Sequence, residues 1–208
     1  VAQAILGPDG SGLSVIKDQT GMTGHIHETT IPEGPVTSSS EQVISLKGPL
    51  DNSMSALKLL GEVVMQYANE PWYEQWAMST NCRDTTPGKR GFKGGKDGPG
   101  KGPRNGGPGA IKVLISEQEL ATIRQDPQTL KQMQLATGCS HKLGNGTYPG
   151  TSLQEITLRG ANGEAAFQAI MVVLTALAEA NGLINCGDGM VPPGEARVKL
   201  VVPKRAAA

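Results

Sequence analysis

The stretch AILGPDGSGLSVIKDQTGMTG, from Ala4 to Gly24, decides how this sequence is interpreted. Apolar residues at helical spacing over Leu13–Gln19 predict a helix. Thr20-Gly21 then predicts its end, because glycine readily takes the left-handed conformation found there. In front of this helix, Gly7-Pro8-Asp9-Gly10 predicts a tight turn from a preceding helix. The stretch therefore predicts two helices joined through a Gly-x-x-Gly turn.

The same layout returns in the second half of the chain. A second helix, Leu130–Ala136, ends at Thr137-Gly138. In both halves an alternating segment then ends in a basic residue and glycine, which predicts a strand, and a long amphipathic helix follows. The strands are Gln42–Gly48 and Glu155–Ala161, and the helices are Asp51–Asn69, with Asp51 as its N-cap, and Asn162–Asn181. The sequence predicts two copies of one unit.

A further repeat lies near the C-terminus. IKVLIS, Ile111–Ser116, matches VKLVVP, Val198–Pro203, position by position in character, and each predicts a strand. The second unit thus has an opening strand, and the first unit has none before it. Either Val198–Pro203 begins a third unit, or it folds back to complete the first. Because unpaired sheet edges seek partners, the sheet of the first unit can accept this strand.

Between the two units the composition changes sharply. Thr86–Gly109 holds ten glycines, four prolines, six cations and one acid in 24 residues. Such a segment has too little apolar surface to offset the entropy of ordering it, so we expect a flexible basic linker.

The net charge, the length of the apolar runs and the cysteine spacing exclude several classes of protein. The 208 residues carry 19 basic and 19 acidic side chains, so the net charge attracts neither nucleic acid nor membrane. The longest apolar run, near Ala165–Ala178, is too short to span a bilayer, so we expect a buried helix and no membrane partner. Three widely spaced cysteines form no disulfide framework, which favours an intracellular site, cytoplasmic or nuclear.

Together, the element order, Leu6-Gly7-Pro8-Asp9-Gly10 and the two Thr-Gly helix ends resemble the type I KH domain, a small RNA-binding fold. The resemblance covers roughly 4–69 and 110–181. It implies an α+β fold of two KH-like modules, each with a three-stranded antiparallel sheet and three helices on one face. We expect module 1 over 1–76, lacking its opening strand or receiving it from 197–203. In this family the opening strand pairs antiparallel with the strand before the long helix, so the resemblance implies that Val198–Val202 lies beside Gln42–Lys47. Module 1 is followed by a linker over 77–109, by module 2 over 110–183 and by a tail with a strand over 184–208.

By this resemblance, the chain is a non-catalytic single-stranded RNA-binding protein in post-transcriptional regulation. KH domains hold about four nucleotides with the Gly-x-x-Gly loop against the RNA backbone. The implied contacts in module 1 are Ile5, Leu6, Gly7, Pro8, Asp9, Gly10, Ser11, Leu13, Ile16, His25 and Ile26. The linker cations Lys89, Arg90, Lys93 and Lys96 would follow the phosphates without sequence preference.

Two departures from the family pattern bear on this function. Binding-competent loops usually carry Lys or Arg where this chain has Pro8-Asp9, and Asp9 repels phosphate. In module 2 the loop position holds Arg124-Gln125-Asp126-Pro127. Asp126 and Pro127 predict a helix start, so we expect a structural loop from which Arg124 touches phosphate only from the side. The alternative function is therefore a protein-interaction scaffold built on degenerate modules.

The remaining chemistry-bearing residues favour structural roles. His25 and His27 lie on one predicted strand, but no third metal ligand is near, so we expect no metal and no cofactor. Cys139 is expected to be a buried thiol, and His141 a surface strand residue. The aromatic rings of EPWYEQW, Glu70–Trp76, are of a kind that stacks RNA bases, but we expect this segment to anchor the end of the long helix or to meet a partner. No spacing predicts a catalytic group.

Overall fold

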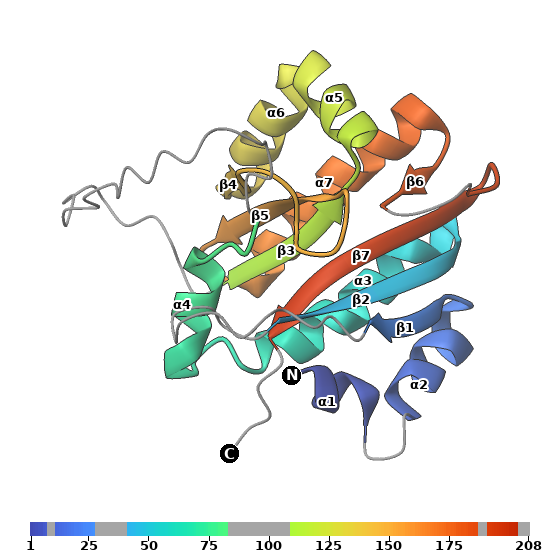
Figure 1. Ribbon diagram of the computed structural model, residues 1–208, viewed down its shortest axis with the longest axis vertical. Helices are drawn as coiled ribbons and strands as arrows, with labels where there is room; N and C mark the ends of the chain where they lie inside the picture. Colours follow the sequence, from blue (N-terminus) through green and yellow to red (C-terminus); the bar gives the residue numbers. More distant parts are fainter. Residues whose placement is uncertain (8–10, 28–40, 83–108, 187–190, 204–208) are drawn as a thin grey trace.

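The computed structural model describes residues 1–7, 11–27, 41–82, 109–186 and 191–203 (Figure 1). Pro8, Asp9, Gly10 and the linker cations Lys89, Arg90, Lys93 and Lys96 therefore lie outside the described residues. The helices are α1 (Ala2–Leu6), α2 (Ser11–Thr20), α3 (Leu50–Met65), α4 (Pro71–Met78), α5 (Glu117–Gln125), α6 (Pro127–Thr137) and α7 (Gly163–Asn181). The strands are β1 (Thr23–His27), β2 (Glu41–Pro49), β3 (Gly109–Ile115), β4 (Ser140–Leu143), β5 (Gln154–Gly160), β6 (Ile184–Asn185) and β7 (Glu195–Pro203).

The described strands form one sheet in the order β1-β2-β7-β3-β5-β4, and every pair along this path is antiparallel. The short β6 runs parallel to β7. Figure 1 shows α3 and α7 on the same face of the sheet. The expected α+β class is confirmed.

The C-terminal strand completes the sheet of the first unit, as we expected. β7 pairs antiparallel with β2 along its whole length, with Gln42 opposite Val202 and Lys47 opposite Arg197. The segment assigned to a tail is thus a central strand, with β2 on one side and β3 on the other. Its even-numbered side chains Val198, Leu200 and Val202 are buried in the main core.

The two units meet across a local pseudo-twofold axis. β3 and β7 pair antiparallel about Val113 and Leu200, so Lys112 lies opposite Val201 and Leu114 lies opposite Lys199. In the repeat, Lys112 of the second unit corresponds to Lys199, and Leu114 corresponds to Val201. Equivalent strands therefore make equivalent contacts, and one sheet runs through both units.

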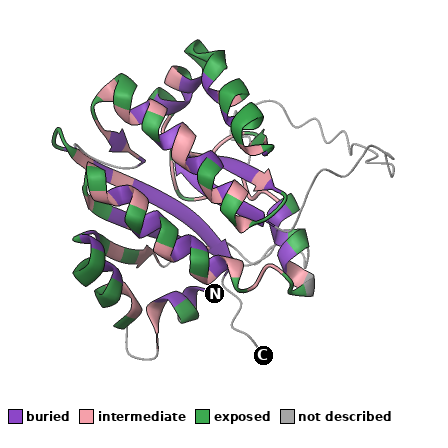
Figure 2. Cartoon of the chain, turned by 180° about the vertical axis from the view of Figure 1, so that it is seen from behind, coloured by how far each residue is buried: buried purple, intermediate pink, exposed green. Residues whose placement is uncertain are grey.

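One hydrophobic cluster lies beneath this sheet and includes side chains of both units. The two long helices meet within it: Phe167 of α7 lies against Gly61 of α3, where an added Cβ would be 3.6 Å from the ring. Figure 2, seen from behind, shows exposed residues on the outer surface of these helices and buried residues toward the sheet. Apolar burial between the units therefore contributes to the stability of both.

Helix ends follow the expected chemistry with two corrections. Gly21 and Gly138 have φ values of +69° and +67°, as expected for helix C-termini. The N-cap of α3 is Pro49 without a side-chain cap, so the expectation that Asp51 caps this helix is wrong. The helix also ends at Met65 rather than Asn69. The next amides donate to carbonyls three residues earlier instead of four: Tyr67 donates to Val64, and Ala68 donates to Met65.

The aromatic segment after α3 forms α4, which is anchored to the second unit. Tyr73 and Trp76 are buried. The Tyr73 hydroxyl accepts from the Ala110 amide at 3.1 Å and donates to the Ala110 carbonyl at 3.0 Å. Burial raises the pKa of Tyr73 to about 12. Residues 77–82, which the sequence analysis assigned to the linker, include the buried Ala77 and continue along the sheet.

α7 has the length and apolar composition to cross a membrane, so the expectation that its apolar run is too short to span a bilayer is wrong. It is the single such helix among the described residues. A core helix of a soluble protein can meet the same criteria. Six of its side chains are buried in the core: Ala166, Ala169, Ile170, Val173, Leu174 and Leu177. It therefore serves as a packing surface for the sheet in this structure.

Candidate nucleic-acid interface

The turn in the first unit lies between two helices, where the sequence predicts it. α1 ends at Leu6, Gly7 follows with φ +71°, and α2 begins at Ser11. Gly7 is partly exposed, and a Cβ added there would lie 2.9 Å from Ser11 Oγ. Side chains rarely adopt this φ, so the conformation requires glycine. The first glycine of the motif thus presents bare backbone beside the start of a helix.

A neighbouring glycine, Gly12, sets the close crossing of α1 and α2. A Cβ at Gly12 would lie 2.0 Å from the Ile5 carbonyl oxygen, a distance that no side chain can occupy. The sequence analysis missed this residue. The sequence did contain a sign of this close contact, because glycine is an unfavourable residue within a helix and Gly12 lies in its first turn. Gly12 holds the two helices together and so fixes the position of the turn.

The apolar residues expected to form a base-binding surface are divided between core and surface. Ile5 and Ile16 are buried in the core, whereas Leu6, Leu13 and Ile26 are partly exposed. Leu13 of α2 lies against Gly24 of β1, where an added Cβ would be 2.7 Å from Leu13 Cδ2. Leu13 and Ile26 therefore remain available at the junction of α2 and β1.

The structure separates His25 from this apolar surface. Ile26 lies opposite Ile44 on the face covered by helices, whereas His25 lies opposite Ser45 on the other face. Successive strand residues point to opposite faces, so these neighbours serve two different surfaces. The resemblance had implied that both residues are RNA contacts of module 1. His25 is exposed, as expected for a strand histidine.

In the second unit, the corresponding loop has a structural role, as we expected. Asp126 caps α6 by accepting from the Gln128 amide at 3.1 Å and from Thr129 Oγ1 at 2.6 Å, and Pro127 is the first helical residue. Arg124 is exposed at the end of α5. Side chains occupy the positions where glycines would let a phosphate approach the backbone.

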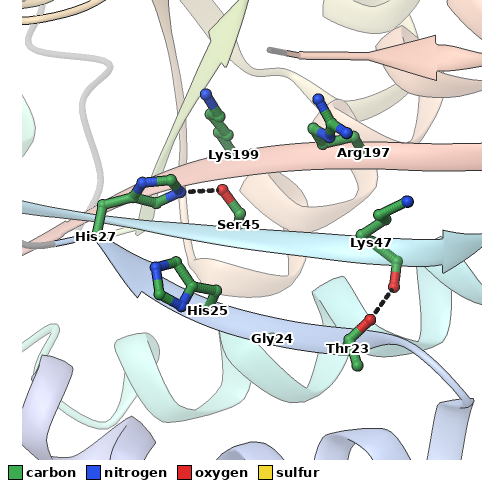
Figure 3. Close-up of a pocket in the computed structure, with 8 residues that line it drawn as sticks. All are labelled: Thr23, Gly24, His25, His27, Ser45, Lys47, Arg197 and Lys199. Atoms are coloured by element: carbon green, nitrogen blue, oxygen red, sulfur yellow. Dashed lines mark hydrogen bonds between the residues drawn. The ribbon is translucent and has the colours of Figure 1, made fainter. Parts of the chain in front are cut away.

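A hollow of about 400 Å³ opens on the face of the sheet opposite the helices. Figure 3 shows its lining from β1, β2 and β7. The lining residues are Thr23, Gly24, His25, His27, Ser45, Lys47, Arg197 and Lys199. They include three basic side chains, of which Lys199 is buried, and two histidines.

The strand register explains why these cations meet. Lys47 lies directly opposite Arg197, and Ser45 lies opposite Lys199. Glu195 lies at the rim of the hollow, with one of its oxygens 3.9 Å from Lys47 Nζ. Both of these side chains are well exposed, so this ion pair contributes little.

Two interactions order the histidine side of the hollow. The ring of His27 contacts Ser45 Oγ through Nε2 (Figure 3). The His25 and His27 rings meet edge to face, with centroids 5.0 Å apart. The hollow therefore has a positioned polar wall on β1 facing the cations of β7.

The equivalent place in the second unit is filled. Lys112, which corresponds to Lys199, is fully buried, and its Nζ lies 2.8 Å from Glu41 Oε1 and 3.8 Å from Glu155 Oε1. It also donates to the Ser79 carbonyl at 2.9 Å. Tyr148 covers the cluster and lies 3.3 Å from Glu41 Oε2. Lys112 is thus enclosed by the carboxylates of Glu41 and Glu155 and by the segments that carry Ser79 and Tyr148.

Burial controls the ionisation of this cluster. Desolvation raises the pKa of Glu155, and the nearby Lys112 ammonium opposes that shift without cancelling it. Glu41 also faces Glu155 and raises its pKa, whereas hydrogen bonds from Thr157 and Thr80 lower it. Desolvation likewise raises the pKa of Tyr148. The folded protein therefore holds a proton on Glu155 more firmly than the unfolded chain does.

The raised pKa of Glu155 predicts a loss of stability with rising pH. Between the ordinary pKa of 4.5 and the raised value, the folded state binds more protons, so the free energy of unfolding falls as pH increases. We expect Glu155→Gln to remove this slope. The test is urea unfolding from about pH 4.5 to about pH 8, comparing wild type with E155Q. The exposed E62Q variant is the control, and a wild-type-to-E155Q difference independent of pH would contradict the assignment.

Two expectations about single residues are confirmed. Cys139 is fully buried, and His141 is exposed on β4. The described residues contain no group of three or more metal-ligating side chains.

The hollow itself was not found by sequence reasoning. Its signal was the alternation of polar residues in GHIH, ISLK and ARVK. Alternation shows which residues share a face, but it does not show which strands are neighbours. The register of β7 on β2 was needed to bring Lys47, Arg197 and Lys199 together.

No known protein family matches this chain. No curated protein shows significant sequence similarity to it either.

Proposed function

We propose that this chain is a non-catalytic single-stranded RNA-binding protein built from two KH-like units of type I. The first unit comprises α1, α2, β1, β2, α3 and β7, and the second comprises β3, α5, α6, β4, β5 and α7. The two separate three-stranded sheets that the resemblance implied are not present: β7-β2-β1 and β3-β5-β4 are the two halves of one continuous antiparallel sheet, and in this proposal each half belongs to one unit. The first unit is the RNA-binding one.

The proposal depends mainly on one observation, the bare backbone at Gly7. This residue is partly exposed, has φ +71° and lies between two helices. α2 begins at Ser11, directly after the motif, and the N-terminus of a helix attracts anions. Leu13 of α2 and Ile26 of β1 are partly exposed, and unstacked bases could rest against these apolar side chains.

Charge in the turn decides how tightly RNA binds under this proposal. Asp9 adds a carboxylate to the Gly7–Gly10 motif, which repels phosphate, and Pro8 offers no amide hydrogen. The first unit is therefore a weak binder whose affinity can be improved. Substitutions in the turn can therefore test for an increase in RNA affinity as well as for a decrease.

Substituting Asp9→Lys is expected to tighten binding of a short single-stranded RNA pool by about tenfold at low salt. P8D adds a second carboxylate and is expected to weaken binding by a similar factor. Fluorescence anisotropy with labelled RNA of about four nucleotides measures both.

The controls are matched substitutions at the corresponding loop of the second unit. Q125K adds one positive charge there and Q125D adds one negative charge, both at an exposed position. Neither should change the affinity. Equal affinities for D9K, P8D and wild type would contradict RNA binding at this turn. Replacing Lys89, Arg90, Lys93 and Lys96 with serine separates a linker contribution from that of the turn.

A specific observation supports a second role for the second unit. Asp126 and Pro127 use the corresponding loop to start α6, which leaves no bare glycine backbone. This unit is better suited to a protein-interaction or scaffold role. Loss of RNA affinity through P8D, with no change through Q125D, would support this division of roles.

A further inference from the structure

We propose that residues 79–82 form a latch over the buried cluster of Glu41, Lys112 and Glu155, and that ionisation of Glu155 opens this latch. The latch directly follows α4, which ends at Met78. It lies on the face of the sheet opposite the helices, where it covers part of the second unit. Its opening exposes a thiol and an apolar surface that the closed form hides. This inference does not depend on RNA binding.

Three consecutive latch residues each contact a different charged residue of the buried cluster. The Ser79 carbonyl accepts from Lys112, the Thr80 hydroxyl hydrogen-bonds to Glu155, and the Asn81 side-chain amide donates to Glu41. The three charged side chains are themselves fully buried. The latch is thus held through the cluster, so the charge of the cluster determines how firmly it is held.

The last latch residue, Cys82, packs tightly against the second unit. A Cβ added at Gly144 would lie 2.5 Å from Cys82 Sγ and 3.2 Å from Thr80 Oγ1, so the latch lies directly against the chain that follows β4. Cys82 also packs against a small apolar cluster, whose members are Val43, Leu114, Tyr148, Leu153 and Val201. The Cys82 thiol is partly exposed, whereas Cys139 and Cys186 are buried. Its reactivity therefore reports on the latch.

The charge beneath the latch depends on Glu155. When Glu155 is neutral, the Lys112 ammonium balances the Glu41 carboxylate, whereas one ammonium faces two buried carboxylates when Glu155 is ionised. Desolvation raises the pKa of Glu155, and water that enters the open cluster removes this effect. The closed latch is therefore favoured most below the ordinary pKa of 4.5 and loses this advantage as pH rises toward the raised value.

Several elements place charged or polar groups around Glu155. These groups are Glu41 of β2, Lys112 of β3, Thr157 of β5, Thr80 and Cys82 of the latch, and Tyr148 between β4 and β5. Burial raises the pKa values of Cys82 and Tyr148 above their ordinary values of 9.0 and 10.0. Neither group therefore ionises in the pH range where Glu155 begins to lose its proton, and Glu155 controls the change of charge.

The test measures how strongly the folded chain protects Cys82 from iodoacetamide, which alkylates thiolates. Protection is the alkylation rate in a peptide of residues 78–86 divided by the rate in the full chain at the same pH. Mass spectrometry of proteolytic peptides assigns each alkylated cysteine. From about pH 5 to about pH 8, we expect protection in the wild type to fall by up to about tenfold per pH unit below the raised pKa. In E155Q it should change less than about twofold overall, because glutamine keeps the neutral form.

A partly exposed thiol can also react without any opening, but the expected sign is then opposite. The Glu155 carboxylate raises the pKa of the Cys82 thiol, so ionisation of Glu155 in a closed latch would slow alkylation and increase protection. Only opening makes protection fall as pH rises. This comparison needs the wild type alone, so it remains decisive if E155Q does not fold.

Cys139 of the core provides an internal control for global unfolding. Because the latch opens locally, Cys82 should be at least about tenfold less protected than Cys139 at every pH. N81A removes the hydrogen bond to Glu41 and should lower the protection of Cys82 about tenfold at about pH 5. N69A, at an exposed asparagine, is the matched control and should leave protection unchanged.

The outcomes decide between the explanations. Protection of Cys82 that falls with pH in the wild type and not in E155Q supports the latch. Protection that stays constant or rises with pH in the wild type contradicts it, and an equal fall in E155Q would show that another group controls opening. Equal protection of Cys82 and Cys139 would mean that both react only through global unfolding. Since the assay contains no RNA, none of these results changes the RNA-binding proposal.

Discussion

Replacing Lys112 with methionine is expected to lower the free energy of unfolding by about 3–5 kcal/mol. Lys112 is fully buried and lies between Glu41 and Glu155, at 2.8 and 3.8 Å from their oxygens. Methionine has nearly the same length but leaves two buried carboxylates facing each other without a cation. The loss is a large fraction of the roughly 5–15 kcal/mol that stabilises a typical domain. Urea unfolding of wild type and K112M measures it.

Two further variants make this result interpretable. K142M alters an exposed lysine on β4 and should change stability by less than about 0.5 kcal/mol. The triple variant K112M/E41Q/E155Q removes all three charges and is expected to recover much of the loss, because the damage in K112M comes from uncompensated charge rather than lost volume. A loss below about 1 kcal/mol in K112M would show that the cluster does not hold the two units together.

Removing β7 is expected to abolish the cooperative fold of the whole chain. A chain truncated after Gly194 loses the strand that pairs with both β2 and β3. It also loses the buried Val198, Leu200 and Val202 from the core that both units share. Two strand edges and the apolar surface beneath them would then face water. Amide spectra and thermal unfolding of chain 1–194 should show no cooperative transition.

A chain ending at Pro203 is the matched control, because it retains all of β7, and it should unfold like the full sequence. The point variant L200A tests the same contact more gently, with an expected loss of about 2–5 kcal/mol for a buried leucine. A 1–194 chain that still melts cooperatively near the wild-type temperature would show that β7 is dispensable.

Local patterns predicted the elements well. Apolar spacing predicted α2 and α6, and the Thr-Gly pairs predicted their ends, because the left-handed glycine at a helix C-terminus is a local requirement. The error at Asp51 has a local cause too. An acidic residue in the first turn stabilises a helix whether or not it is the cap, so the pattern did not distinguish the two positions.

Sequence alone determined the α+β class, the glycines that end α2 and α6, and the start of α6 at Asp126 and Pro127. These features follow from backbone conformation and from periodicities only a few residues long. Tertiary structure decided which strand completes the first unit, where Lys112 finds its carboxylates, and that Lys47, Arg197 and Lys199 share a hollow. Glu41 and Lys112 are 71 positions apart, and no local pattern specifies which strands become neighbours across such a distance.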